Sequence, residues 1–349
     1  DGTSFMVVND NPVKWFSKDH DIRVADKVLN EHFGGTYVAY LVVEGGSEGA
    51  MKNPEVAQYV GKIQGSLEDL SVVGKTTSYV DVVKKVSFEL NDEDKAFDVV
   101  PDNRKAIAQY LFLYEMSGNP DDLYHLVDSS YEKANIWVHL TSGDNKDMVA
   151  VTESLDEFFQ SNPPPVGVSS WWAGLTYLNV VWQDKMVSGM LSALAGSAIV
   201  VFLMMTLLFR SPVWGFVTMI PLTLTIAFIY GLVGYVGKDY DMPIAVLSAL
   251  TLGISIDFAI HLSQRARQIR AKTESWSEAV IELYGEPVRA IARNMFVITI
   301  GFSPLLLSSL LPYKTVGVFF AAIMAVSGVA TLIILPSIMT VIKGALKLK

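Results

Sequence analysis

The sequence predicts an α-helical membrane bundle joined to an α+β domain outside the membrane, and three observations support this. Of the 349 residues, 51% are hydrophobic and only 18% are charged, whereas soluble domains carry about a quarter charged residues. Residues 1–184 carry 18 Asp and 11 Glu against 14 Lys and Arg, while residues 185–349 carry 13 Lys and Arg against 7 acids. The third observation is a series of long apolar runs confined to the second part.

The apolar runs predict a transmembrane domain over residues 185–349. They lie at about 186–209, 212–236, 242–262, 290–311 and 315–342. Each has about 20 residues or more, which is enough to cross a hydrocarbon core of about 30 Å as a helix. Core helices of a large soluble protein are a weak alternative, because such helices rarely occur five in a row without a polar face.

The distribution of basic residues predicts the orientation of this bundle. Arg265, Arg267, Arg270 and Lys272 follow the third run, and cytoplasmic loops of membrane proteins carry an excess of Lys and Arg. We therefore expect residues 1–184 to lie on the side of the membrane opposite the cytoplasm. Residues 273–284 combine apolar and acidic positions at helical spacing, which predicts an amphipathic helix on the inner membrane surface. A solvated connector helix fits the same pattern equally well.

Residues 1–184 contain the signals of a domain in which helices pack on one face of a sheet. Helical periodicity ends at Gly34-Gly35, and Asn53-Pro54 has the order of an N-cap followed by a first-turn proline. The expected helices cover 22–33, 54–70, 103–116 and 146–160. The expected strands cover 36–43, 134–140 and 166–172.

Several kinds of site are not expected. The chain has no cysteine, which excludes disulfides, thiolate metal sites and cysteine nucleophiles. Its histidines lack metal-ligand spacing, and Gly74-Lys75-Thr76-Thr77 lacks the earlier glycine of a nucleotide-binding loop. The acidic balance argues against a nucleic-acid partner. We therefore predict no catalytic residues, no cofactor and no metal.

One carboxylate interrupts the apolar pattern of the third run. Asp257 lies eight residues before Arg265, about 12 Å along a helix and so close to mid-membrane. A carboxylate there costs about 2.5 to 3.5 kcal/mol, so it must be paired, hydrated or protonated. His261 follows one turn later on the same face and could exchange a proton with Asp257. Asp257 could instead join helices through a hydrogen bond, and His261 could lie near the headgroups.

Other polar residues of the bundle are candidates to support a proton relay. They are Ser255 in the third run and Asn294, Thr299 and Ser303 in the run at 290–311.

The stretch Gly253-Ile254-Ser255-Ile256-Asp257-Phe258-Ala259-Ile260-His261, followed by Arg265, resembles the fourth-helix signature of the resistance-nodulation-division (RND) superfamily. The resemblance is greatest to its MMPL-like and hopanoid-transporter-like branch and covers nearly the whole chain. Further matching motifs occur in order along the chain: Gly34-Gly35-Thr36, Phe209-Arg210-Ser211, Ile220-Pro221, Gly301-Phe302 with Ser308, and Leu335-Pro336.

The resemblance implies a particular architecture. Each half of such a protein has one helix, a periplasmic porter domain and five more helices, and two halves form a twelve-helix pump. This chain is similar to one half without its first helix, and the resemblance assigns proton uptake to Asp257. The MMPL-like pattern commonly has Tyr after that Asp, whereas Phe258 stands here. The missing hydroxyl partner could lie in the other half.

The resemblance also implies a function, which is secondary active transport rather than enzymatic catalysis. We expect proton-driven export or transport of hydrophobic or amphiphilic substrates, with lipids as one candidate class, across or out of the bacterial inner membrane. The expected partners are the substrate, membrane lipids, the other half, and oligomeric or periplasmic proteins. The alternative is a non-pumping accessory or receptor protein, sterol-sensing-like or protein-export-like, whose external domain binds a lipid or protein. An apolar tunnel in that domain would favour transport, and an exposed apolar patch would favour the alternative.

Overall fold

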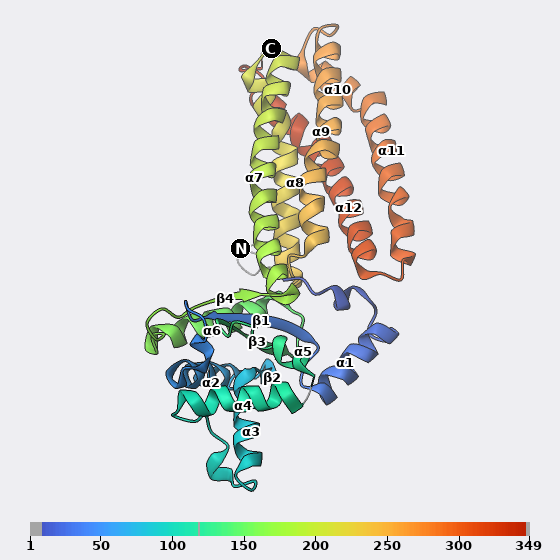
Figure 1. Ribbon diagram of the computed structural model, residues 1–349. Helices are drawn as coiled ribbons and strands as arrows, with labels where there is room; N and C mark the ends of the chain where they lie inside the picture. Colours follow the sequence, from blue (N-terminus) through green and yellow to red (C-terminus); the bar gives the residue numbers. More distant parts are fainter. Residues whose placement is uncertain (1–8, 118, 347–349) are drawn as a thin grey trace. The chain divides into compact units, whose positions relative to one another are not determined.

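The computed structural model describes residues 9–117 and 119–346 (Figure 1), and only the backbone of residues 191, 242, 245, 246, 248–252 and 254. The chain forms two compact units. The sheet unit comprises residues 18–182 with 11–13, and the helical unit comprises residues 183–349 with 1–10 and 14–17. The division after Trp182 lies two residues before the predicted boundary.

The sheet unit is built on a four-stranded antiparallel sheet in the order β2-β3-β1-β4. Strands β1 and β3 pair along their full length, from Tyr37 opposite Leu140 to Glu44 opposite Lys133. Alternate residues of both strands are buried and their neighbours are more exposed, which is the pattern of a sheet packed on one face. The strands are β1 (Tyr37–Glu44), β2 (Val73–Thr77), β3 (Lys133–Leu140) and β4 (Ser169–Ala173).

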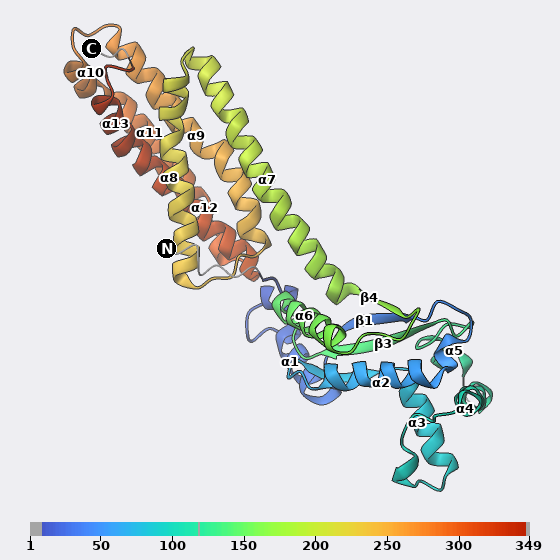
Figure 2. The same cartoon turned by 90° about the vertical axis from the view of Figure 1, so that its left-hand side faces the viewer.

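The helices of the sheet unit supply the other half of its core. Val60 and Ile63 of α2 and Val151 of α6 are buried against the packed face of the sheet, and α2 runs along the strands in Figure 2. The structure therefore agrees with the predicted packing of helices on one face. The helices are α1 (Asp21–Phe33), α2 (Pro54–Glu68), α3 (Tyr79–Leu90), α4 (Arg104–Ser117), α5 (Pro120–Tyr124) and α6 (Asn145–Ser161).

Local signals explain where these helices begin and end. The Asn53 side chain accepts a hydrogen bond from the Glu55 amide at 3.1 Å, and Pro54 occupies the first turn of α2. Gly34 ends α1 with a φ of 70°, a left-handed conformation that favours glycine. Each predicted helix and strand of this region is present, with its ends shifted by a few residues.

Three elements of the sheet unit were not predicted: β2, α3 and α5. The Gly74-Lys75-Thr76-Thr77 stretch, considered above only as a nucleotide-binding loop, forms most of edge strand β2. The start of α3 carries a recognisable signal, since Ser78 and Asp81 form a capping box.

Within the described residues, four helical stretches are long and apolar enough to cross a membrane: 175–209, which begins before the division at Trp182, and 212–236, 276–307 and 311–341. The remaining predicted run falls within the 29-residue helix α9, and a fifth crossing stays a prediction. The helices are α7 (Leu175–Phe209), α8 (Pro212–Val236), α9 (Met242–Arg270), α10 (Trp276–Leu283), α11 (Glu286–Gly301), α12 (Leu311–Val329) and α13 (Leu335–Val341).

The turn between the last two apolar runs differs from the expectation. Helix α11 ends at Gly301 and is followed by a 3-10 turn over Ser303–Leu307, because Pro304 cannot continue an α-helix. Helix α12 then begins at Leu311 with Pro312 in its first turn. The chain therefore turns at 308–310, and not at 312–314 as predicted.

Helix α12 is the centre of the bundle and packs against α8, α9 and α11. A Cβ at Gly328 would lie 2.2 Å from the Met295 sulfur, so a larger residue there would require the Met295 side chain to move, and glycine favours the close approach of α11 and α12. Between α12 and α13 the chain forms a π-helical turn over Ala330–Ile334.

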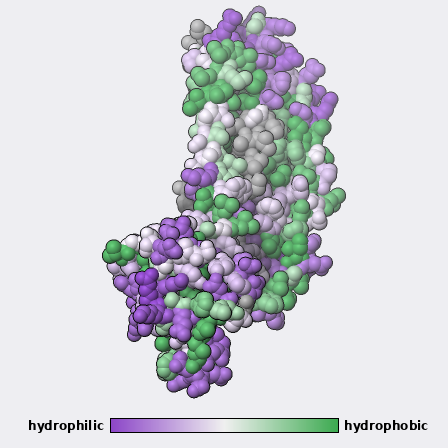
Figure 3. Space-filling model, in the orientation of Figure 1, coloured by the Kyte–Doolittle hydropathy of each residue, from purple (hydrophilic) through white to green (hydrophobic). Residues whose placement is uncertain are grey.

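The amphipathic helix α10 is docked on this bundle. Trp276 and Leu283 are buried, and the Trp276 Nε1 donates to Thr340 Oγ1 at 2.9 Å. The Tyr284 hydroxyl, just after α10, donates to the Leu332 carbonyl at 3.0 Å. Hydrophilic residues gather at this end of the helical unit (Figure 3).

Candidate functional site

Helix α9 carries the predicted relay pair, and its ends have clear causes. Asp241 accepts a hydrogen bond from the Ile244 amide at 3.2 Å and so caps the first turn. Arg267 and Arg270 lie in the last turn, where positive charge complements the helix dipole.

The two faces of α9 have different surroundings. Ser255, Ala259, Leu262 and Ala266 are at most 1% exposed, and they form the face that packs into the bundle. Asp257, His261 and Arg265 recur every four residues on an exposed face. The structure therefore places Asp257 and His261 on one face, one turn apart, and this face is not covered by the rest of the described chain.

A cavity of about 680 Å³ lies between α9, α10 and α11 and contains the second relay candidate. His261, Phe258 and Arg265 line it from α9, and Asn294 lines it from α11. Asp257 precedes His261 by one turn and is not among the lining residues. The imidazole of His261 is therefore open to this cavity.

The other supporting candidates lie in different places. Ser255 lies on the buried face of α9, and its carbonyl accepts a hydrogen bond from Ser327 Oγ at 3.3 Å. The Thr299 hydroxyl is buried and has no hydrogen-bond partner among the described residues. Ser303 is exposed in the turn after α11. The structure thus brings Asn294 and His261 to one cavity and places Ser255 on the opposite face from Asp257.

The structure also shows buried hydroxyl groups that the sequence analysis missed. Ser327 and Thr331 are fully buried, one turn apart, and face α9 and α8. The hydroxyls of Ser255, Ser263 and Thr331 lack partners in the described part of the chain. The signal in the sequence was their spacing among small residues, since Ser327, Gly328 and Thr331 recur at helical intervals.

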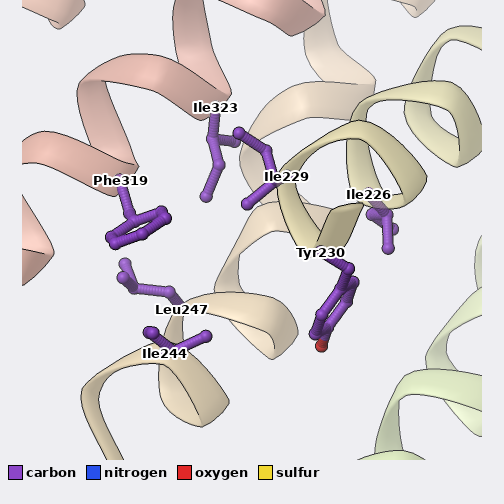
Figure 4. Close-up of a pocket in the computed structure, with 7 residues that line it drawn as sticks. All are labelled: Ile226, Ile229, Tyr230, Ile244, Leu247, Phe319 and Ile323. Atoms are coloured by element: carbon purple, nitrogen blue, oxygen red, sulfur yellow. The ribbon is translucent and has the colours of Figure 1, made fainter. Parts of the chain in front are cut away.

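A second, much smaller cavity lies between α8, α9 and α12. Its volume is about 20 Å³, which is roughly the space for one water molecule. Figure 4 shows Phe319, Ile323, Leu247 and Ile244 directed toward a common space. This apolar space is too small for a substrate.

No metal centre accompanies the relay candidates. Within residues 9–117 and 119–346, no group of three or more His, Asp or Glu side chains is arranged to hold a metal ion.

Comparison with known proteins identifies the family. The sequence profile of the MMPL family matches residues 15–347. The chain belongs to the MMPL family. MMPL proteins are membrane transporters of lipid-like substrates, so this chain is a multi-pass membrane protein of a transporter family, and membership agrees with the predicted absence of an enzyme active site.

Two relatives illustrate the range of MMPL architectures. The chain is 22% identical over 348 residues to a protein of Methanocaldococcus jannaschii named as a membrane protein, MJ1562, and the match covers 96% of this chain and 83% of that protein. It is 25% identical over 218 residues to a protein of Mycobacterium leprae named as a transport protein, MmpL4. That match covers 59% of this chain and only 22% of MmpL4.

Proposed function

We propose that this chain is one half of a proton-driven MMPL transporter that exports hydrophobic or amphiphilic, lipid-like substrates from the bacterial inner membrane. Protonation of Asp257 supplies the coupling step. The sheet unit is the periplasmic porter domain, and the basic end of the helical unit faces the cytoplasm.

The exposure of Asp257 carries the proposal. An ionised carboxylate near mid-membrane is too costly to face lipid, and the described side chains of this chain leave it open. The remaining possibilities are protonation, hydration or pairing with a group outside this chain. A carboxylate that passes between these states is suited to bind and release a proton.

His261 and its cavity provide the path from Asp257 to the cytoplasm. His261 lies one turn closer to the basic end of α9 and lines the 680 Å³ cavity. Moving one charge through 100 mV is worth about 2.3 kcal/mol, which is enough to shift a two-state arrangement of helices.

The second half of the transporter covers the exposed face of α9 in this proposal. Phe258 is 2% exposed and has no hydroxyl, so a hydroxyl or basic partner for Asp257 comes from that half. The second half could belong to the same polypeptide or to a separate chain. MmpL4 is far longer than this chain, which fits two halves in one polypeptide, and MJ1562 is of similar length, which fits two separate chains.

The test is proton flux in proteoliposomes that contain the intact protein and an imposed pH gradient. We expect Asp257→Asn to reduce flux by at least tenfold, because an amide cannot take up the proton. Asp184→Asn removes an exposed carboxylate of α7 and serves as the matched control. Flux that survives Asp257→Asn at the wild-type rate would overturn the coupling role.

One observation favours the alternative, a non-pumping protein whose external domain binds a partner. Helix α1 has no buried residue, and Ile22, Leu29 and Phe33 on one of its faces are 42%, 43% and 69% exposed. An exposed apolar face is a common feature of binding surfaces. Crosslinking in cells from a photoreactive residue at position 29 tests it: one recurrent protein adduct together with no proton flux would place this alternative first.

A further inference from the structure

The Phe209-Arg210-Ser211 motif forms one wall of a second large cavity, which the proposed transport cycle does not use. The motif joins α7 to α8, and Arg210 turns the chain with a left-handed φ of 52°. The cavity has a volume of about 640 Å³ and lies beside the C-terminal end of α9. Three arginines line it: Arg210, Arg267 and Arg270.

The charge of this cavity distinguishes it from the cavity beside His261. Among residues 9–117 and 119–346, its lining includes three guanidinium groups and no carboxylate. The cavity beside His261 has Arg265 and Lys272 but also Glu282 and Glu286, so its charges nearly balance. The described lining of the cavity beside Arg210 is therefore the more positively charged of the two.

Aromatic stacking holds one of the three arginines in place. The Arg267 guanidinium lies 5.6 Å from the ring centres of both Phe209 and Trp214, and its Nη1 donates to the Phe209 carbonyl at 3.2 Å. Arg270 Nη1 donates to the Thr273 carbonyl at 2.7 Å. Short-range contacts thus hold both side chains at the wall of the cavity.

The remaining parts of the wall also suit a phosphate group. Ser211 is the N-cap of α8, but its side chain makes no capping hydrogen bond. The first amides of α8 point out of the same end of the helix and add a partial positive charge. Orienting a membrane protein requires basic residues in the cytoplasmic loops, but it does not require three arginines to converge on one cavity.

Apolar surface on the helix that leads into the cavity indicates that the phosphate belongs to a lipid. Leu203 and Leu207 of α7 are 53% and 77% exposed, and α7 leads directly into the Phe209 wall. Trp214 and Leu346 add apolar lining. Basic pockets of this kind between membrane helices on the cytoplasmic side bind anionic headgroups.

We propose that this cavity binds the phosphate of an anionic phospholipid, with the acyl chains along α7. Arg210 and Arg270 contact the phosphate oxygens, and Arg267 holds the aromatic wall. The assignment to the cytoplasmic leaflet rests on the orientation in the proposed function, but the binding itself does not depend on proton coupling.

The test measures lipid binding to the full chain in detergent by native mass spectrometry and thermal unfolding, with phosphatidylglycerol, phosphatidylcholine or 10 mM inorganic phosphate. We expect phosphatidylglycerol to bind in preference to phosphatidylcholine, and Arg210→Gln to weaken phosphatidylglycerol binding about fivefold. Arg289→Gln removes an exposed arginine that lines neither cavity and is expected to have no effect. Arg210→Lys should retain part of the affinity, because it keeps the charge but loses the bidentate geometry.

Three results would overturn the proposal: equal binding of the two lipids, equal effects of Arg210→Gln and Arg289→Gln, or protection by inorganic phosphate as large as that by phosphatidylglycerol. The last result would assign the cavity to a soluble phosphate compound. Lipid binding by Asp257→Asn separates the two proposals. If Asp257→Asn still prefers phosphatidylglycerol, the lipid-binding proposal is supported whatever the proton flux. If the wild-type protein shows no such preference, the lipid-binding proposal fails and the proton-flux result is unaffected.

Discussion

The two units of this protein differ in how many buried hydroxyl groups lack a partner among the described residues. In the sheet unit this is the Tyr79 hydroxyl, and in the helical unit these are the hydroxyls of Thr206, Ser255, Ser263, Thr299 and Thr331. In the sheet unit, Gln64, Thr76 and Ser78 are at most 5% exposed, and they satisfy one another: Ser78 Oγ donates to Gln64 Oε1 at 2.7 Å and Gln64 Nε2 donates to Thr76 Oγ1 at 3.2 Å. A buried polar group without a partner costs about 1 to 3 kcal/mol.

The apolar surfaces of the two units differ in the same way. The sheet unit encloses most of its apolar side chains in one core, whereas α7 has only 6% of its apolar stretch buried. Apart from the exposed face of α1, the sheet unit is therefore built around its own core, while the helical unit requires lipid and, in our proposal, a second half. Stability should reside in the first unit, and function in the surfaces that the second leaves open.

The largest expected effect is in the core of the sheet unit. Ile136 is fully buried on the central strand β3, so Ile136→Ala should cost about 2 to 5 kcal/mol through lost burial and a cavity. Hydrogen exchange read by mass spectrometry should show faster exchange in β1 and β3 and no change in α12. An equal increase of the exchange rate in both units would contradict the conclusion that stability resides in the sheet unit. Leu207→Ala is the control, because Leu207 is 77% exposed.

The next effect concerns the satisfied polar network. Gln64→Leu removes the acceptor of the buried Ser78 hydroxyl and should destabilise the sheet unit by about 1 to 3 kcal/mol. Gln58→Leu removes only an exposed hydrogen bond to Asp102, and we expect a change within about 0.5 kcal/mol. Urea titration read by proteolysis measures the free energy of unfolding of the sheet unit in both variants. Equal losses in Gln64→Leu and Gln58→Leu would show that the buried network does not stabilise this unit.

A smaller effect is expected where α10 docks on the bundle. Pro336 cannot donate to the Leu332 carbonyl four residues earlier, and the Tyr284 hydroxyl donates to it instead. Hydrogen bonds between membrane helices contribute about 0.6 kcal/mol on average, so Tyr284→Phe should speed exchange in 330–341 about threefold. Unchanged exchange there would mean that packing of Trp276 and Leu283 alone holds α10.

The smallest effect is a pH dependence in the sheet unit. Burial lowers the pKa of His139, which a backbone hydrogen bond with Gly35 partly opposes. The folded state therefore resists protonation, and stability should fall as the pH drops below the unfolded value of about 6.5. His139→Gln should reduce the pH dependence of stability, measured as the hydrogen-exchange rate of β3 at several pH values. Helix α8 has no histidine and serves as the reference; a variant that keeps the wild-type slope would exclude His139 as its source.

Elements with strong local signals were predictable from the sequence, and the contacts between them were not. The proline and N-cap signals located α2 and the glycine pair located the end of α1, whereas the strand order of the sheet depends on pairings between distant segments. The four-residue spacing placed Asp257 and His261 on one face. The packing of α12 decides which face of α9 stays exposed, and the sequence does not show this. Ser255 is two positions before Asp257, so helical geometry places it on a different side of α9.

The cavity beside Arg210 could not be predicted for the same reason. The stacking of Arg267 on Phe209 joins residues 58 positions apart, and only the packed bundle brings them together. In the sequence, Arg267 was one of several basic residues that indicated orientation. The packing shows which of these charges share one space.

The π-helical turn at Ala330–Ile334 makes the last membrane segment tolerant of one kind of length change. A π turn holds about one residue more than an α turn, so deletion of a single residue within 330–334 would leave α12 and α13 in phase and their buried faces aligned. The same deletion within α12 would rotate everything beyond it by about 100° and turn Leu335 and Met339 out of the bundle. Natural gaps and insertions in this segment should therefore accumulate at this turn.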